Sequence, residues 1–448
     1  MAAIEQNLSP STTVMYTDRR DFYIKPDVVK NNYTIVTPFL TSVANWNQIL
    51  YPKDPQFKMF EYQVPWIKQY FQVTTGTTVD VDNAEDTLAV TVTGAVGMPS
   101  AFTNHLLGLK LAVHANVGGK PSGASKGEVI VTTFTSTTSI NVKGIGVFGD
   151  QFVVANDDWL VVIGTGFGEG TEAANPSSDD IQVVWNQCGI HKTSFQLTNT
   201  LMQASLRGES KEYDRRKLLK AQEHQVQKER DMLFSTSAIG TNLAHGDTFA
   251  DGKITDAAGN TIRTTYGVFA AVLNYGITDV TDDNQNIFDI NSASYSYSNW
   301  VDDSEKFFEY NPEGTIPVYS SNKLISFLNK LEGTGGQGIA AKSRWTINMG
   351  FPAMSKSQPG KLGFNYRELE SPHGTYQFVK TPTITKSPYN GYGLAPDPAN
   401  IFHVVYRKPM YQQIIKTDNA PDYQKNQYMS DEGMGISNLT NHKMLRLV

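Results

Sequence analysis

The chain has 448 residues, which suffices for two to four ordinary domains or for one elongated body with large insertions. Its formal charge of −6 is small for this length, and acidic and basic residues are interspersed, which argues against a dedicated nucleic-acid binder. Its one cysteine, Cys188, rules out an intrachain disulfide and a thiolate metal cluster, and its longest apolar runs are too short to span a bilayer.

Residues 1–55 show no sustained period of 3.6 or 2, and Pro26, Pro38 and Pro52 stand among apolar residues. We predict an extended N-terminal arm. Because exposed aromatic and branched side chains are costly in water, we expect this arm to lie on another surface, its own or a neighbour's. Residues 1–13 are small and polar and lack the basic and apolar regions of a secretory signal, so we expect no classical secretion. The single cysteine favours folding in a reducing cytosol.

A β-rich region follows, in which apolar and polar residues alternate between about residues 64 and 197. The clearest alternating runs are residues 88–93, 109–114 and 129–134, and residues 139–143 form a further plausible strand. Clusters of turn-forming residues separate such runs at 94–99, 118–127 and 164–178. We predict an antiparallel sheet or a small sandwich with long hairpins, and not a parallel doubly wound domain.

Strong helix formers fill residues 209–234, and no Gly or Pro occurs until Gly240. This composition predicts one long helix, about 40 Å long at 1.5 Å per residue. Charges of both signs run round most of its circumference, so we expect it to be exposed along much of its length and not buried in a bundle. A solvated charged face is the favoured interpretation, and a nucleic-acid grip is the alternative.

The remainder mixes short helices and strands, which indicates an α+β body. Helices are predicted at residues 266–275, 299–308 and 322–331. The last of them should be capped by Ser320, Ser321 or Asn322 and stopped by Gly333. Strands are predicted at residues 316–319, 344–349, 375–379, 401–406, 410–415 and 443–448.

A glycine motif invites comparison with a dinucleotide site, since Gly144, Gly146 and Gly149 match G-x-G-x-x-G after a predicted strand. Another strand-like run follows, beginning near Phe152. Without a helix N-terminus to receive a pyrophosphate, the motif has no physical basis. We interpret it as a glycine-rich turn between strands.

Two acidic clusters lie in polar stretches of the chain. The first comprises Asp80, Asp82, Glu85 and Asp86, and the second comprises Asp279, Asp282 and Asp283. Either has the oxygen ligands that a hard cation prefers, but neither has the spacing of a calcium-binding loop. We interpret both as solvated loop tips.

The chain lacks the short motifs of zinc hydrolases, acyl-transfer enzymes and nucleotide hydrolases. Cys188 lies between Trp185 and Ile190 in a strand-like run, where a buried, inert thiol is favoured over a nucleophile. We predict no catalytic residue, no cofactor and no metal site. A pair of glycosidase carboxylates stays open, because its geometry is not local in the sequence.

The order of these parts resembles that of tailed-bacteriophage major capsid proteins with the Hong Kong 97-type (HK97-like) fold, in the group with an enlarged β-rich region before the spine helix. Three stretches carry the likeness, which extends from about residue 46 to residue 448. They are residues 207–234, the succession 266–275, 300–310 and 318–331, and the end of the chain at 418–447.

The resemblance implies an α+β fold divided into five regions. These are an N-terminal arm (1–55), a β-rich E-loop region (56–200), a spine helix of the peripheral domain (201–240), an axial domain (241–400) and C-terminal strands of the peripheral domain (401–448). No charged, coiled-coil-like segment precedes the arm, so we expect no internal scaffold. Lone residues such as Lys68 and Lys143 have no local motif of a covalent cross-link, so we predict a non-covalent shell.

The resemblance also implies a function without catalysis. Such a protein self-assembles into pentameric and hexameric capsomers of an icosahedral shell, with weak, non-specific contact to the packaged DNA. Its other partners would be decoration, portal and scaffolding proteins, and it would be made in the bacterial host cytoplasm. The alternatives are a phage tail tube, a sheath or another β-rich virion protein, and then a carbohydrate-active enzyme.

Overall fold

The computed structural model describes residues 37–47, 49–62, 70–82, 84–96, 107–117, 119–136, 138–171, 181–203, 212–238, 254–278, 284–309, 314–334, 358–359, 365–415 and 422–448. The chain divides into two compact units. Unit 1 comprises Met1–Met59, Val183–Thr278 and Asn284–Val448, and unit 2 comprises Phe60–Gln182 and Asp279–Asp283. Both helices and strands are abundant, so the predicted α+β class is confirmed.

Unit 2 contains a closed barrel of six antiparallel strands, ordered β2-β4-β7-β6-β5-β9. The strands are β2 (Tyr70–Thr75), β4 (Asp86–Val96), β5 (Leu109–Val117), β6 (Lys120–Ser136), β7 (Ser139–Ile145) and β9 (Trp159–Thr165). Two short strands, β3 (Thr78–Asp80) and β8 (Gln151–Val153), pair beside it. The antiparallel prediction is confirmed, and β2 closes the sheet into a barrel by pairing with both β4 and β9.

Two of the predicted turns in unit 2 are partly wrong. β4 continues through Gly94, and β6 already begins at Lys120, so strands occupy part of residues 94–99 and most of residues 118–127. Gly119 has a φ of 85°, and its N–H donates to Asn116 Oδ1 at 3.0 Å. The reversal is therefore tight, and the β5–β6 ladder continues on both sides of it.

Unit 1 contains a four-stranded antiparallel sheet in which β20 lies at the centre. Its strands are β11 (Gly189–Thr198), β18 (Ile401–Val405), β19 (Tyr411–Ile415) and β20 (Tyr423–Ile436). A separate two-stranded sheet pairs β1 (Gln56–Glu61) with β10 (Gln182–Gln187). All ten residues of β11 pair with β20, and β11 alternates between buried and exposed residues, so one face of this sheet is covered.

A seven-stranded mixed sheet also belongs to unit 1, ordered β12-β21-β17-β13-β16-β15-β14. Its strands are β12 (Ile287–Ile290), β13 (Thr315–Ser320), β14 (Gln358–Pro359), β15 (Asn365–Ser371), β16 (Gly374–Lys380), β17 (Tyr392–Ala395) and β21 (Lys443–Leu447). The accompanying helices are α6 (Tyr297–Phe308), α7 (Asn322–Thr334), α9 (Pro382–Thr385), η6 (Pro398–Asn400) and η7 (Leu439–Asn441). The predicted strand at 344–349 lies outside the described residues.

Helix α7 begins as predicted and ends later. Ser321 Oγ accepts a hydrogen bond from the Leu324 N–H at 3.3 Å, as an N-cap residue does. The predicted stop at Gly333 is wrong, because the helix runs to Thr334. A glycine inside a helix costs only about 1 kcal/mol, which the surrounding turns tolerate.

Four further helices in unit 1 are α2 (Pro38–Trp46), α3 (Asn199–Gln203), α4 (Glu212–Phe234) and α5 (Val268–Tyr275). Helix α2 corrects the prediction that residues 1–55 are extended, while residues 1–36 lie outside the described residues. Pro38 stands at the start of α2, where its fixed φ suits a helix. Phe39 and Val43 are fully buried, so tertiary packing stabilises a helix too short to be recognised from periodicity.

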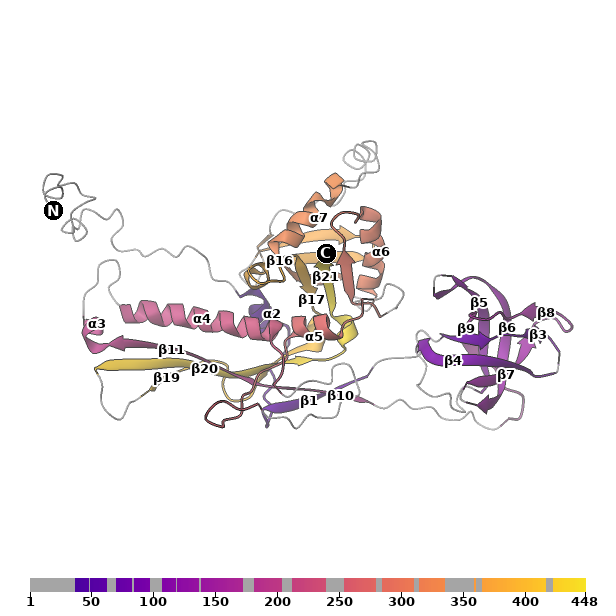
Figure 1. Cartoon of the computed structure of the whole chain (residues 1–448), viewed down its shortest axis with the longest axis horizontal. Coiled ribbons are helices and arrows are strands. Elements are labelled where there is room, and N and C mark those ends of the chain that lie inside the picture. Colours follow the sequence, from indigo (N-terminus) through magenta and orange to yellow (C-terminus); the bar gives the residue numbers. More distant parts are fainter. Residues whose placement is uncertain are drawn as a thin grey trace. The chain divides into compact units, whose positions relative to one another are not determined.

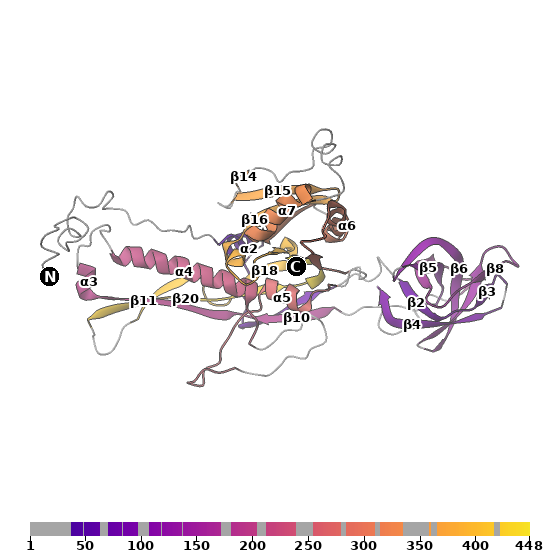
Figure 2. The ribbon, with the colours of Figure 1, turned by 45° about the horizontal axis from the view of Figure 1, so that its top comes forward.

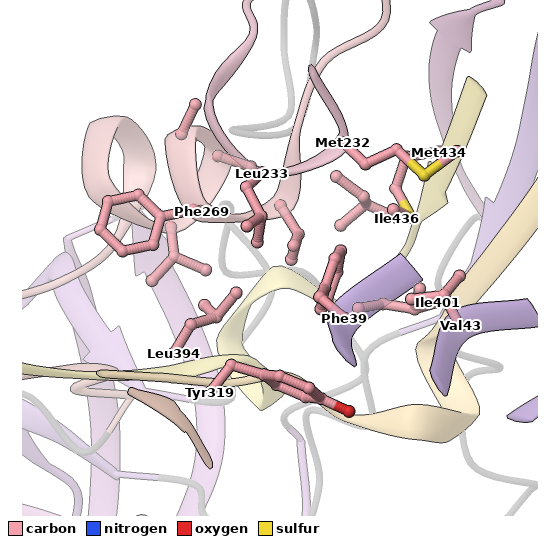
Figure 3. Packing of buried hydrophobic residues seen from close by; sticks show 14 of the residues in the cluster. Phe39, Val43, Met232, Leu233, Phe269, Tyr319, Leu394, Ile401, Met434 and Ile436 are labelled. Carbon is pink, nitrogen blue, oxygen red and sulfur yellow. The ribbon is translucent and has the colours of Figure 1, made fainter. Parts of the chain in front are cut away.

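The main core of unit 1 lies where α2, α4 and α5 meet both sheets. Figure 3 shows its packing, with Phe39 among side chains from the end of α4 and from several strands. Ten of its buried residues are labelled there: Phe39, Val43, Met232, Leu233, Phe269, Tyr319, Leu394, Ile401, Met434 and Ile436. This core fixes the C-terminal end of α4 in the body of unit 1.

Candidate functional site

Helix α4 lies along β11 and β20, as both views of the chain show (Figures 1 and 2). The predicted long helix is therefore confirmed. The expectation that it would be exposed along much of its length is wrong for its second half, where His224, Lys228, Glu229, Met232 and Leu233 are buried. Lys228 finds a charged partner in a strand, and Glu229 finds hydrogen-bond donors in two short helices, so neither needs water.

His224 occupies the middle of the contact between α4 and the sheet. Its Nδ1 lies 3.0 Å from Thr193 Oγ1, and its Nε2 lies 2.9 Å from Ser430 Oγ. Because the Thr193 hydroxyl donates to Gln227 Oε1 at 2.7 Å, it accepts from His224 Nδ1–H, and the ring is the neutral Nδ1–H tautomer. Burial, with the nearby Lys228 ammonium, lowers the pKa of His224 from 6.5 to about 4.

One turn further along α4, Lys228 forms a buried ion pair with Glu432 of β20. Lys228 Nζ lies 2.7 Å from Glu432 Oε1, and His403 Nε2 of β18 lies 2.7 Å from Glu432 Oε2. The Glu432 side chain is fully buried. Since a buried carboxylate is costly unless it is paired, these three residues tie α4 to two strands as one unit.

Asp231 makes a third polar link between helix and sheet. Its Oδ2 lies 3.0 Å from Nδ1 of His191, which is buried on β11. The polar links at His224, Lys228 and Asp231 follow one another along α4, at the spacing of residues on one helix face. We call them, together with their strand partners, the α4–sheet network. It fixes the register of the helix on the sheet.

Asp431 is the neighbour of Glu432 in β20. Because successive side chains of a strand alternate, Asp431 points to the face of the sheet opposite α4. Its Oδ2 accepts from Arg263 Nη2 at 2.8 Å and from Arg407 Nε at 2.9 Å. Arg263 also lies over the Tyr406 ring, 5.7 Å from the ring centroid. The two arginines come from segments far apart in the sequence, and Asp431 joins both to β20.

Glu229 has a different environment, because its carboxylate binds no cation among the described residues. Its Oε2 accepts from the Leu40 N–H at 3.3 Å, and its Oε1 accepts from the Thr383 hydroxyl at 2.5 Å. Burial raises the pKa of Glu229 from 4.5 to about 7, although the hydrogen bonds from Thr383 and Leu40 lower it in part. Glu229 thus titrates near neutral pH inside the core.

Glu229 binds the starts of two helices that lack side-chain caps of their own. Thr37 and Thr381, which precede α2 and α9, make no side-chain cap hydrogen bond. Both helices begin with proline, and neither contains a charged residue. The carboxylate of Glu229 is therefore an acceptor for a free N–H group at the start of α2, and it holds the start of α9 through the Thr383 hydroxyl.

These polar groups are held by one another, and no arrangement of a nucleophile with a base and an oxyanion site emerges among the described residues. Within the described ranges, no three His, Cys, Asp or Glu residues are grouped so as to hold a metal ion. One local signal could have indicated the network: His224 and Lys228 stand four residues apart in the predicted helix. What the arrangement achieves is mechanical, namely a helix locked to a sheet.

The glycine motif is a turn, as predicted. Gly144 lies in β7, Gly149 has a φ of 95°, and β8 follows without a helix. A Cβ at Gly144 would lie 2.8 Å from the backbone oxygen of Asp80, so glycine is required for a close approach of two strands. The motif has a packing role and is not a dinucleotide site.

The other residues singled out from the sequence lie apart from the α4–sheet network. The prediction of a solvated loop tip is wrong for Asp80 and Asp86, which are half-buried at the end of β3 and the start of β4, where Asp86 Oδ2 accepts from the Asp80 N–H at 3.1 Å. Cys188 is buried, as predicted, and desolvation raises the pKa of its thiol to about 12. Lys143 lies in β7. The second acidic cluster at 279–283 and Lys68 lie outside the described residues.

Among the helices in the described part of the chain, none has the length and apolar character needed to cross a membrane.

A family model described as SU10 major capsid protein matches residues 37–446. No curated protein sequence matches the chain. The matched residues include nearly all of the described structure, in both units.

Solved structures similar to this chain share little sequence with it. The capsid of Myoviridae Phage XM1 has 9% identity and a TM-score of 0.40, with 96% of this chain and 98% of that chain covered. The capsid of the native GTA particle has 10% identity and a TM-score of 0.39, with 63% and 81% covered. Gordonia phage Cozz has 8% identity and a TM-score of 0.38, with 64% and 78% covered.

Proposed function

Because the chain belongs to the SU10 major capsid protein family, we propose that its copies form the icosahedral shell around the DNA genome of a tailed bacteriophage. The observation that carries this proposal is the family match over residues 37–446. A shell-forming protein acts by binding copies of itself. Its work is done by interfaces, so a catalytic centre is not required.

The α4–sheet network suits this task. Rings of five and six subunits close only if each subunit presents its contact surfaces at a fixed angle. Polar links at His224, Lys228 and Asp231 oppose sliding of α4 along the sheet, since each buried polar group would lose its partner. We propose that α4 and its sheet form the rigid strut of the tile.

We assign the regions of the tile by the HK97-like arrangement. Residues 1–55 would be the N-terminal arm, 56–200 the β-rich E-loop region, 201–240 the spine helix, 241–400 the axial domain and 401–448 the C-terminal strands of the peripheral domain. The order of barrel, long helix and α+β body supports this assignment. Helix α2 would then anchor the end of the arm to the body.

The partners follow from this role. Copies of the chain would assemble without covalent cross-links into pentameric and hexameric capsomers, and decoration, portal and scaffolding proteins would bind to the assembled lattice. Contact with packaged DNA would be weak and non-specific. Synthesis in the bacterial host cytoplasm agrees with the single buried cysteine, which needs no oxidising compartment.

Negative-stain microscopy of the purified chain tests the proposal. Pentamers, hexamers or closed shells support it, whereas tubes favour the tail-tube alternative and dispersed monomers at all concentrations contradict both. Leu218 of α4 is 61% exposed and apolar, so Leu218→Ser should reduce the assembled fraction. Asp214→Ser, a change at another exposed position of the same helix, is the control and should leave assembly unchanged.

A further inference from the structure

The two larger sheets of unit 1 depend on residues 423–447, which we call the closing segment and which contain β20 and β21. In the four-stranded sheet, β11, β18 and β19 each pair with β20. None of these three pairs with any other strand in the described part of the chain. Without β20, this sheet therefore has no ladder of backbone hydrogen bonds.

Strand β21 has a similar place in the seven-stranded sheet, where it lies between β12 and β17. Among the described strands, β12 has no partner except β21. On its other side, β17 is joined to β13 by only two residue pairs, Tyr319 with Leu394 and Ser320 with Gly393. Removal of β21 would therefore detach β12 and leave β17 weakly held.

The closing segment also fills the two main hydrophobic cores of unit 1. Met434, Ile436, Leu439 and Met444 are buried in the core that contains the C-terminal end of α4. Leu445 is buried in the second core, which contains residues of α6 and α7. Because burial of such side chains is the dominant favourable contribution to folding, neither core is complete before this segment is present.

Buried cations elsewhere in unit 1 have their partners in the closing segment. Lys228 Nζ of α4 lies 2.7 Å from Glu432 Oε1, and Arg263 Nη2 lies 2.8 Å from Asp431 Oδ2. A buried cation without its carboxylate strongly destabilises a fold. The part of unit 1 that precedes the closing segment therefore cannot take up its native arrangement alone.

The barrel of unit 2 needs none of this segment. All its strands lie within residues 70–165, and so do the buried residues of its core. Its most distant paired residues are Tyr70 and Val161, whereas Gly189 of unit 1 pairs with Glu432. Because pairing of residues that are closer in sequence loses less chain entropy, the barrel can fold once its last strand has been synthesised.

We propose that the closing segment sets the time at which a copy becomes able to assemble. The barrel folds while the chain is still being synthesised, and unit 1 folds only after residues 423–447 have left the ribosome. About 280 residues separate the end of β9 from the end of β21, which corresponds to roughly 15–60 s of synthesis at about 5–20 residues per second. This inference rests on the proposed function, because it concerns when a copy can bind other copies.

The consequence is that unfinished copies are kept out of the shell. Surfaces of unit 1 that bind other copies would join chains prematurely if they formed during synthesis. Because both larger sheets need the closing segment, those surfaces form only on copies that contain it. A chain truncated before β20 is excluded for the same reason.

Stalled nascent chains test the proposal. The full chain is synthesised in a cell-free system and halted on the ribosome after a Gly/Ser linker that follows Val448, because such a linker is flexible and adds no structure. A short linker keeps the closing segment inside the exit tunnel, and a long linker places it outside. Brief proteolysis then cuts the unfolded parts, and mass spectrometry identifies the protected fragments.

We expect both stalled chains to yield a protected fragment of the barrel, and only the chain with the long linker to yield protected fragments of unit 1. In the chain with the long linker, Glu432→Lys should abolish the fragments of unit 1 and retain that of the barrel, because it places a second ammonium group beside Lys228. Protected fragments of unit 1 from the chain with the short linker would overturn the proposal, as would loss of the barrel fragment from both chains.

Microscopy of the released full chain is the parallel measurement. Absence of particles there would contradict the proposed function, whereas the proteolysis decides the order of folding independently of assembly. The two failures are therefore distinguishable.

Discussion

Replacing Glu229 with Gln should stabilise unit 1 at neutral and alkaline pH. The folded-state pKa of Glu229, about 7, is above its ordinary 4.5 because the carboxylate is buried without a cation. Below pH 4.5 the group is protonated in both states, and its contribution to stability is fully present. As the pH rises through 7 that contribution is lost, and the loss reaches about 3 kcal/mol.

The glutamine side chain imitates the protonated acid. Its oxygen accepts from the Leu40 N–H, and its amide N–H₂ donates to Thr383 Oγ1, so both hydrogen-bond positions stay filled. The stability difference between Glu229→Gln and the unaltered chain should therefore be close to zero at pH 4.5 and about 3 kcal/mol at pH 8, in favour of the variant.

Urea titrations of the unassembled chain, followed by hydrogen exchange of peptides from α2 and α4, measure this difference in unit 1 alone. Glu223→Gln is the matched control: Glu223 is half-exposed on the same helix and pairs with Lys220 at 2.6 Å, a surface contact worth less than about 1 kcal/mol. Should Glu229→Gln be less stable than the unaltered chain at pH 8, the capping contribution of the ionised carboxylate exceeds its burial cost, and the reasoning is refuted.

Three further predictions follow from single contacts. Lys228→Met leaves Glu432 buried without its ammonium partner and should lower the free energy of unfolding by about 3–5 kcal/mol in urea titrations. Adding Glu432→Gln should recover part of that loss. If the losses of the two single variants simply added, the ion pair would be contradicted. As the pH falls from 6.5 to 4, the stability of His224→Gln should rise by about 3 kcal/mol relative to the unaltered chain, because the pKa of the buried imidazole is lowered. If both proteins unfold at the same acidic pH, this prediction is wrong. Gly144→Ala puts a Cβ 2.8 Å from a backbone oxygen of β3 and should cost about 1–3 kcal/mol, visible as a lower thermal midpoint, whereas Gly164→Ala meets nothing within 4 Å and should be neutral.

The long helix and most of the strands are predictable because the evidence for them is local. Helix α4 ends at Phe234 as the composition predicts, and β5, β7, β13, β16 and β21 fall on the alternating or apolar runs. The turn between β7 and β8 is predictable for the same reason: a strand-like run follows the glycine motif within a few residues. Local patterns therefore suffice for the elements, and even for rejecting a false motif.

Strand β20 is the element that periodicity hides. Its buried residues include Asn426, Ser430, Asp431 and Glu432, which a hydrophobic pattern counts as exposed. Their partners lie on α4, on β18 and at Arg263, far away in the sequence. The desolvation cost of these groups is offset only by partners that come together in the folded chain, so no window of neighbouring residues reveals the site.

Barrel closure and helix α2 fail to be predicted for a related reason. Whether six antiparallel strands stay open, form a sandwich or close depends on the pairing of β2 with β9, which joins residues about ninety positions apart. Helix α2 is nine residues long, and isolated helices of that length are marginal in water. Its formation depends on burial of Phe39 and on the cap supplied by Glu229.

The two buried titrating residues of α4 oppose each other. Ionisation of Glu229 destabilises the fold as the pH rises from 4.5 to 7, and protonation of His224 destabilises it as the pH falls from 6.5 to 4. The two costs are similar, about 3 kcal/mol each, and they replace one another across the same range. The unaltered chain should therefore show little net pH dependence from this pair, while Glu229→Gln and His224→Gln have slopes of opposite sign. We expect the double variant to have as little pH dependence in its free energy of unfolding as the unaltered chain, but to be more stable at pH 4 and at pH 7. This result would show that both residues titrate in the folded chain as described.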